Sequence, residues 1–323
     1  MTPEGRDLLT TLTLIVAQGL RFATPYLYAA LGEMFEQLSG LLNLGVDGIM
    51  LLGAFTGFFV VYQAPDQASL PGYLALGVLA AAAVGALMGL ATAVVNVTLR
   101  AEQGISGIGF YMFGFGLSSL LIKITVGRPT PVAFFPDIDF WIGDRRLNEL
   151  PVLGPILFSH NLMTYGAYLL VPVAWWVINR TTLGLKMRAV GQNPEAADTL
   201  GVSVARLRYF TAILGATLAG VAGASLSIAL YHVIQENITN GIGFIAVALV
   251  YFGAWTPLGV LIGSVLFGVV SSVSRWVQLL ELGIDPNIAV MLPYLVTIGV
   301  LVFSVQRVRQ PAALTRPFER GEG

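Results

Sequence analysis

Charge, cysteine and histidine are all scarce in this chain of 323 residues. Only 11% of the residues are charged, against about 25% in ordinary soluble domains, and 17 Lys and Arg nearly balance 18 Asp and Glu. A net charge of −1 creates no field that would attract nucleic acid. The absence of cysteine excludes disulfides, thiolate zinc sites and iron–sulfur clusters, and two isolated histidines leave little for a transition-metal site. We therefore expect no metal, no cofactor and no nucleic-acid partner.

Motifs for ATP hydrolysis and for hydrolase chemistry are also missing from the sequence. The chain has no GxxxxGKS/T phosphate loop, so it cannot bind and hydrolyse ATP by the usual device. It also lacks HExxH and GxSxG, so no catalytic constellation is visible. We expect a non-catalytic protein with no catalytic residues, and energy for any active process must come from elsewhere.

Apolar residues are abundant instead, at 56% of the chain. Because a bilayer core needs about 20 apolar residues of helix, the charge-free runs predict membrane-spanning helices. They predict an all-α, polytopic transmembrane bundle of about nine spans (eight to ten) that forms one domain, residues 1–323. The run 237–274 is too long for one crossing and is broken around Pro257, so it counts as two spans. The runs cover residues 8–31, 41–65, 73–97, 103–122, 162–178, 209–235, 237–274 and 286–306.

Basic residues gather in the loop 179–208 and in the tail 306–323. Short loops rich in Lys and Arg stay on the cytoplasmic side, and the even number of spans between these two segments agrees with both being cytoplasmic. The loop 127–161 is richer in acidic residues and falls on the outside. An odd span count places the amino terminus outside, although a split helix around Arg21 would change that parity.

The local chemistry of the basic loop predicts two short helices joined by a turn. Asn193 is a suitable N-cap, Pro194 suits the first helical position, and Glu195 complements the positive end of the helix dipole. Gly201 ends this helix, and Ser203 is placed to cap the next one. Along the first helix, three apolar residues share one side and form a small exposed face, which indicates a partner. They are Ala196, Ala197 and Leu200.

The same loop carries a family resemblance. Glu195, Ala196, Ala197 and Gly201 match the EAA-three-residues-G signature of bacterial ABC importer permeases. The longer frame AVGQNPEAADTLGVSVARLRYF resembles the branch that serves simple sugars, nucleosides and branched-chain amino acids. The alternative is an ordinary capped loop with no partner. The resemblance implies a coupling helix that docks into a groove of a separate ATPase subunit, and the implied ATPase-coupling residues are Arg188, Asn193, Pro194, Glu195, Ala196, Ala197 and Gly201.

A second informative segment reads LGEMFEQLSGLLNLGVDGIMLLGAF. Glu33, Glu36 and Asp47 border or enter apolar runs, where an ionised group must face water or a partner rather than lipid. Glycines around Asn43 loosen the helix, and a broken helix is tolerated only where it is buried in protein or lines a cavity. Two other interpretations stay open: the two glutamates lie in a solvated cytoplasmic turn, or Asn43 and Asp47 form an internal helix-capping network.

This segment resembles the amino-terminal part of nucleoside-type permeases of the same branch. The segment departs from the pattern of these permeases at two places. Gln37 and Leu38 replace a charged pair, and Asp47 stands where glutamate is common. The resemblance extends over roughly residues 25–305 and implies two inverted repeats. We predict that Glu33, Asn43 and Asp47 line the translocation path.

These observations predict the membrane subunit of an ATP-driven importer in a bacterial inner membrane, with a cytoplasmic carboxyl terminus. A nucleoside is the first-ranked solute, followed by simple sugars and then by riboflavin-like compounds and amino acids. The resemblance implies three protein partners: an ATPase subunit, a second permease as a homodimer or related heterodimer, and an extracytoplasmic solute-binding protein. The alternatives of another class are an ion-coupled secondary transporter, in which Asp47 or Glu33 binds the coupling ion, and a passive channel.

Overall fold

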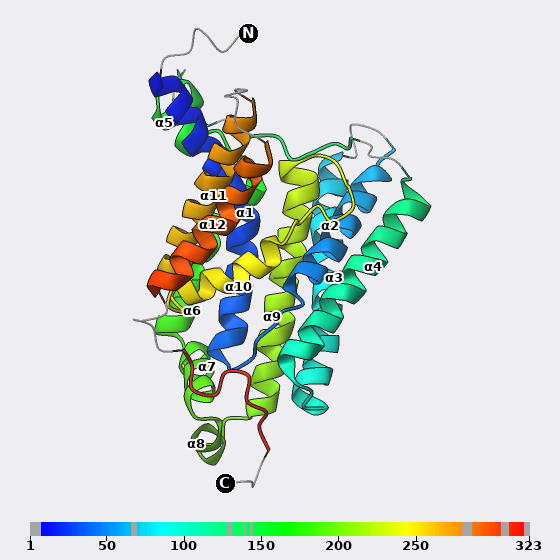
Figure 1. The fold of residues 1–323 in the computed structure, drawn as a ribbon, viewed down its shortest axis with the longest axis vertical. Helices are drawn as coiled ribbons and strands as arrows, with labels where there is room; N and C mark the ends of the chain where they lie inside the picture. The colour runs from blue at the N-terminus through cyan, green and yellow to red at the C-terminus, as the bar shows by residue number, and fades with distance from the viewer. Residues whose placement is uncertain are drawn as a thin grey trace.

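The structure is a computed structural model that describes residues 8–65, 70–127, 131–138, 140–142, 145–279, 286–304 and 310–319. These residues form the expected all-α bundle (Figure 1). Two strands of two residues each, β1 (Trp141–Ile142) and β2 (Arg145–Arg146), pair antiparallel in a loop. The helices are α1 (Leu8–Leu38), α2 (Val46–Tyr62), α3 (Leu70–Ala93), α4 (Gln103–Thr125), α5 (Leu153–Leu157), α6 (Leu162–Arg180), α7 (Thr182–Gln192), α8 (Pro194–Thr199), α9 (Val204–Ser225), α10 (Ile242–Phe252), α11 (Pro257–Leu279) and α12 (Pro286–Ser304). Short turns of other helix types cover Val94–Thr98, Leu147–Glu149 and Leu226–Leu230.

Five of the described helical segments are long and apolar enough to cross a membrane, so the predicted count of about nine spans is not confirmed. The run 237–274 does not form two helices of membrane-spanning length. Its first part is α10, an 11-residue helix of about 16 Å, which is shorter than a bilayer core. The chain before α10 is irregular up to Gly241, whose φ is +80°, and the apolar composition of the run hides that break. The five segments are 70–98, 103–125, 162–180, 204–230 and 257–278.

The first helix is longer than the sequence indicates. α1 is an unbroken helix of 31 residues that continues beyond Leu31 to Leu38. It therefore includes Glu33 and Glu36, which lie in the interior and are each 1% exposed. The interpretation of these two glutamates as part of a solvated turn is therefore wrong. The helix ends beyond them, at the turn that contains Gly40, with a φ of +89° that favours glycine.

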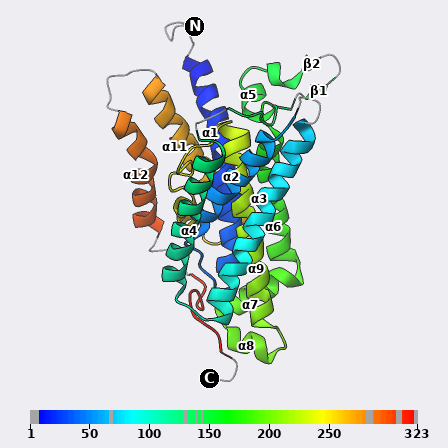
Figure 2. The same cartoon turned by 90° about the vertical axis from the view of Figure 1, so that its right-hand side faces the viewer.

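The helices form two units of similar order and opposite direction. In the first unit, the long helix α1 precedes the short helix α2 and the long helices α3 and α4; in the second, α9 precedes α10, α11 and α12. α1 packs against α11 in the way that α9 packs against α3, and α1 and α9 also contact each other. Because α1 and α9 run in opposite directions (Figures 1 and 2), the two units form the inverted pair that the family resemblance implies.

Glycine allows the central helices to approach closely. A Cβ on Gly53 of α2 would lie 2.3 Å from the carbonyl oxygen of Gly220 on α9. A Cβ on Gly223 would lie 1.9 Å from the carbonyl oxygen of Met50. The backbones of α2 and α9 are therefore in direct contact, as small residues permit between membrane helices.

The two ends of the bundle carry different elements. α5 and the beginning of α1 lie at one end, and α7 and α8 lie at the other, together with residues 310–319 (Figure 1). The basic loop 179–208 and the described part of the carboxyl tail therefore share one end of the molecule. Arg307, Arg309 and Arg320, which also supported the predicted orientation, lie outside the described residues.

Candidate coupling and translocation sites

The structure confirms the predicted capped helix in the basic loop. The side-chain Oδ1 of Asn193 accepts a hydrogen bond from the backbone N–H of Ala196 at 3.0 Å, and Pro194 occupies the first position of α8. Gly201, with a φ of +83°, follows the last turn. These short-range signals fix where α8 begins and where it ends.

Of the three residues predicted to form an exposed apolar face on α8, one is buried. Ala196 is exposed and the side chain of Leu200 is 85% exposed, whereas Ala197 is only 3% exposed and packs into the hydrophobic core. The exposed surface at this end therefore combines Leu200 and Ala196 with two charged side chains, Glu195 on α8 and Arg188 on α7.

α7 is a helix that was not predicted from the sequence. Thr181 caps it by accepting a hydrogen bond from the backbone N–H of Gly184 at 3.3 Å, and Met187 and Val190, three positions apart, are buried. The N-cap threonine and this spacing are signals that the sequence contains. Ser203 occupies the predicted N-cap position of α9, but its side chain makes no capping hydrogen bond.

A buried polar cluster lies where α1 ends and α2 begins. Oε1 of Glu33 accepts hydrogen bonds from the side-chain amide of Gln37 at 2.9 Å and from the backbone N–H of Asn43 at 3.2 Å. The side-chain amide of Asn43 donates to Glu36 at 3.4 Å, and its oxygen accepts from the N–H of Gly45 at 3.0 Å. Glu33 and Asn43, both predicted path residues, are thus brought together.

Gln37 connects this cluster to the second unit of the bundle. Its side-chain oxygen accepts a hydrogen bond from the indole N–H of Trp255 at 2.9 Å, in the turn between α10 and α11. In the sequence, Gln37 stands out only as a departure from the family pattern. Its bridging role depends on a partner 218 residues away, which no local signal could reveal.

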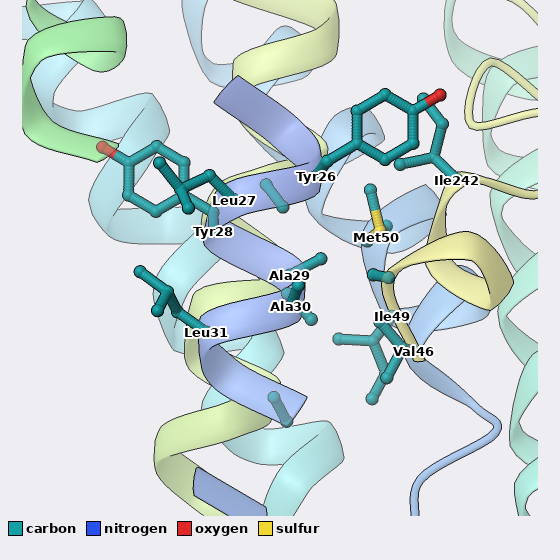
Figure 3. Close-up of a cluster of buried hydrophobic side chains, with 14 of the residues drawn as sticks. Tyr26, Leu27, Tyr28, Ala29, Ala30, Leu31, Val46, Ile49, Met50 and Ile242 are labelled. Carbon is teal, nitrogen blue, oxygen red and sulfur yellow. The ribbon is translucent and has the colours of Figure 1, made fainter. Parts of the chain in front are cut away.

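Asp47, the third predicted path residue, lies at a different place. It is 1% exposed and caps the beginning of α10, where Oδ1 accepts from the N–H of Gly243 at 2.8 Å and Oδ2 accepts from the hydroxyl of Thr239 at 3.0 Å. Around it, Val46 of α2 and Ile242 belong to the hydrophobic cluster that also includes residues of α1 (Figure 3). Asp47 and Asn43 thus each accept a hydrogen bond from a backbone N–H group where the chain leads into a helix.

Residues 310–319 cover this cluster on the side of the bundle that carries α8 (Figure 1). The backbone N–H of Ala313 donates to the carbonyl oxygen of Gly191 at 2.9 Å, and the N–H of Thr315 donates to that of Gly40 at 3.1 Å. Arg208 is 1% exposed and donates to the carbonyl oxygens of Ser39 at 3.2 Å and Arg316 at 3.0 Å. Arg208, one of the basic residues of the loop 179–208, is therefore buried against the tail.

A groove of about 520 Å³ separates these tail residues from the beginning of α8. Its walls include Glu195, Arg316 and Arg100, and Arg100 forms an ion pair with Glu319. Nearby, Glu102 caps α4, and hydrogen bonds from the N–H groups of Ile105 and Gly104 hold the pKa of its carboxyl below the usual value. This end of the bundle thus presents both signs of charge beside α8.

The comparisons with known proteins agree with this architecture. The family model described as the branched-chain amino acid transport system / permease component matches residues 15–301. No solved structure matches the chain at a significant level.

Similar proteins are named as ABC transporter permeases. The chain is 37% identical to the putative glucose ABC transporter permease protein TsgC13 of Haloferax volcanii, covering 92% of this chain and 95% of that protein. It is 33% identical to the guanosine ABC transporter permease protein NupQ of Bacillus subtilis, covering 98% of this chain and 99% of that protein. A second guanosine ABC transporter permease protein of that bacterium, NupP, is 26% identical, covering 78% of this chain and 71% of that protein.

Proposed function

The chain belongs to the branched-chain amino acid transport system / permease component family as an ABC importer permease of the simple sugar and nucleoside branch, and from this premise we propose that its cargo is a nucleoside. The support is the similarity to NupQ over nearly the whole of both chains. The similarity to TsgC13 favours a second candidate, a simple sugar such as glucose, and riboflavin-like solutes rank behind both.

The family implies an ATPase subunit and a substrate-binding protein, and we propose that α7 and α8 form the ATPase-docking surface. The exposed Arg188, Glu195, Ala196 and Leu200 lie there, while Asn193, Pro194, Ala197 and Gly201 fix the helix in place. A displacement of α7 is transmitted to residues 310–319 because Ala313 donates a hydrogen bond to Gly191. From there it reaches the turn at Gly40, at the end of α1, because Thr315 donates to the carbonyl oxygen of Gly40. This chain of contacts connects the docking surface with the interior of the bundle.

The proposed orientation places α8 and residues 310–319 in the cytoplasm and the beginning of α1 outside. The exposed basic side chains of α7 lie at the end that carries α8, as expected for a cytoplasmic surface (Figure 1). The membrane is then the bacterial inner membrane, which the protein crosses several times.

A second permease completes the transporter in this proposal. Two related guanosine permease proteins, NupP and NupQ, occur in one organism, which favours a heterodimer of similar chains over a homodimer. Glu33, Asn43 and Asp47 are proposed to border the path from the broken beginnings of α2 and α10, because irregular backbone at membrane depth is stable where protein or a cavity surrounds it.

Reconstitution with the ATPase, the second permease and the binding protein tests the proposal through guanosine and glucose uptake. Gly201→Val forces a branched residue into a left-handed φ, at a cost of about 1–2 kcal/mol, and should lower guanosine uptake per ATP hydrolysed. Gly72→Val is the matched control, because Gly72 also has open space around it but an ordinary φ. Equal coupling in both variants contradicts the docking role of α8.

The same experiment distinguishes the ATP-driven importer from the alternative, an ion-coupled transporter. That alternative has one observation in its favour: among the described residues, none donates a hydrogen bond to the buried Oε2 of Glu33. Uptake driven by an ion gradient in the isolated chain would support it and contradict the ATP-driven importer. Uptake that needs ATP and the ATPase subunit would exclude it.

A further inference from the structure

We infer that the outer cavity, the space between α1, α11, α12 and the loop before α10, is a nucleoside-contact site within the permease itself, a conclusion that rests on the proposed function. The outer cavity has a volume of about 420 Å³, within the range of small-molecule sites of about 300–1,000 Å³. Its walls carry four aromatic rings and several polar groups. The lining residues that matter here are Phe22, Tyr26, Tyr231, Thr239, Arg275 and Tyr294.

The outer cavity lies toward the end of the bundle that is opposite α8. Arg275 belongs to the last turns of α11, and this part of α11 lies far from α7 and α8 in Figure 1. In the proposed orientation, that end faces the substrate-binding protein. A solute released there would meet the outer cavity before it reaches the centre of the bundle.

Arg275 supplies the directional chemistry of the outer cavity. Its guanidinium lies 4.7 Å from the ring centroid of Phe22 and 4.8 Å from that of Tyr231. Ring faces hold the cation in place without using the N–H groups at its edge, which stay available as donors. Among the described residues, no carboxylate forms an ion pair with Arg275.

A purine nucleoside fits these groups better than a sugar does. A guanidinium donates two parallel hydrogen bonds to O6 and N7 of guanine, and aromatic side chains stack on the base. The rings of Tyr26 and Tyr294 are already oriented, because their hydroxyls contact Ser271 at 3.4 Å and the carbonyl oxygen of Asn240 at 2.9 Å. A hexose has hydroxyls for Arg275 but no base for these rings to stack on.

Contact with the outer cavity also reaches the centre of the bundle. Thr239 lines the cavity and donates its hydroxyl to Oδ2 of Asp47 on α2. The residues after Thr239 lead into α10, which begins at Ile242. Asp47 also accepts a hydrogen bond from the first turn of this helix. A bound nucleoside therefore touches the segment that joins the two broken helices.

The test measures radiolabelled guanosine binding to the complete transporter in lipid nanodiscs without the binding protein, and guanosine uptake with it. Arg275→Lys keeps the charge but loses the bidentate donor, and should raise the half-saturating guanosine concentration about tenfold while thermal unfolding of the complex is unchanged. Tyr231→Ala should weaken binding as well, whereas Tyr231→Phe, which keeps the ring, should bind nearly normally.

Arg180→Lys is the matched control, because Arg180 also lies over an aromatic ring, 5.8 Å from that of Trp175, but outside the outer cavity. If the wild type takes up guanosine but Arg275→Lys and Tyr231→Ala bind it as tightly as the wild type does, the nucleoside site is overturned and the proposed function stands. Wild-type uptake of glucose and not of guanosine overturns the proposed function, and the nucleoside site with it.

Discussion

The two short helices of the bundle occupy corresponding positions in the opposed units, yet their beginnings differ in chemistry. α2 begins after a turn in which Asn43 accepts a hydrogen bond from the N–H of Gly45 and also bonds to Glu33 and Glu36. α10 begins after Gly241 and has no acidic residue of its own; its cap is Asp47, which belongs to α2. The fold repeats, but the polar groups are concentrated in the first unit.

This difference indicates how a helix break is stabilised inside a membrane. Unpaired backbone N–H groups are costly in an apolar medium, so each break needs acceptors nearby. One carboxylate, that of Asp47, satisfies the beginning of α10 and at the same time attaches it to α2. The breaks before α2 and α10 are therefore linked through the side chain of Asp47.

The largest expected effect concerns the contact between the two breaks. A Cβ on Gly243 would lie 2.4 Å from both Cα and N of Asp47, which are backbone atoms and cannot move aside. Gly243→Ala should separate α2 from α10 and destabilise the protein by about 3 kcal/mol. Gly241→Ala has open space and only the strain of a positive φ, about 1 kcal/mol. Thermal unfolding in detergent compares the two, and equal midpoints would contradict a direct contact.

An intermediate effect is expected from removal of the shared cap. Asp47→Ala leaves the N–H of Gly243 and the hydroxyl of Thr239 without an acceptor, at a cost of about 2 kcal/mol. Thr239→Val removes one of the two bonds and should cost about 1 kcal/mol. Asp47→Asn keeps an oxygen for Gly243 and serves as the control. If Asp47→Ala unfolds at the wild-type midpoint, the two breaks are stabilised independently.

The smallest effect is expected at the acidic cluster beside α2. Glu36→Gln keeps an oxygen that accepts the hydrogen bond from Asn43, so it should change the free energy of unfolding by less than about 1 kcal/mol. ATP-dependent uptake should persist, because the role proposed for this carboxyl is to accept a hydrogen bond. Loss of uptake together with normal unfolding would show instead that the charge of Glu36 takes part in transport.

Local signals in the sequence predicted local structure well. Asn193, Pro194 and Gly201 fixed α8 because capping depends on residues within one turn. The helical class followed from composition, since a chain with long apolar runs has few other ways to satisfy its backbone in lipid. The general position of the break before α2 followed in the same way from its glycines and Asn43.

Contacts between distant segments could not be predicted. Asp47 bonds to Gly243, 196 residues away, and the burial of Arg208 depends on carbonyl groups of Ser39 and of the tail. The short length of α10 was missed because hydropathy does not distinguish a helix that crosses a membrane from one that begins inside it. Ala197 was misplaced because an exposed face was assumed before its neighbours were known.

The contacts of residues 310–319 have a consequence for the biosynthesis of this protein. These residues follow α12, so they leave the ribosome only after the described helices have been made. Until then, Gly40 lacks the tail N–H that bonds to its carbonyl oxygen, and Arg208 lacks the carbonyl oxygen of Arg316. The contacts that residues 310–319 make with Gly40 and Arg208 therefore form only after α12 has been synthesised.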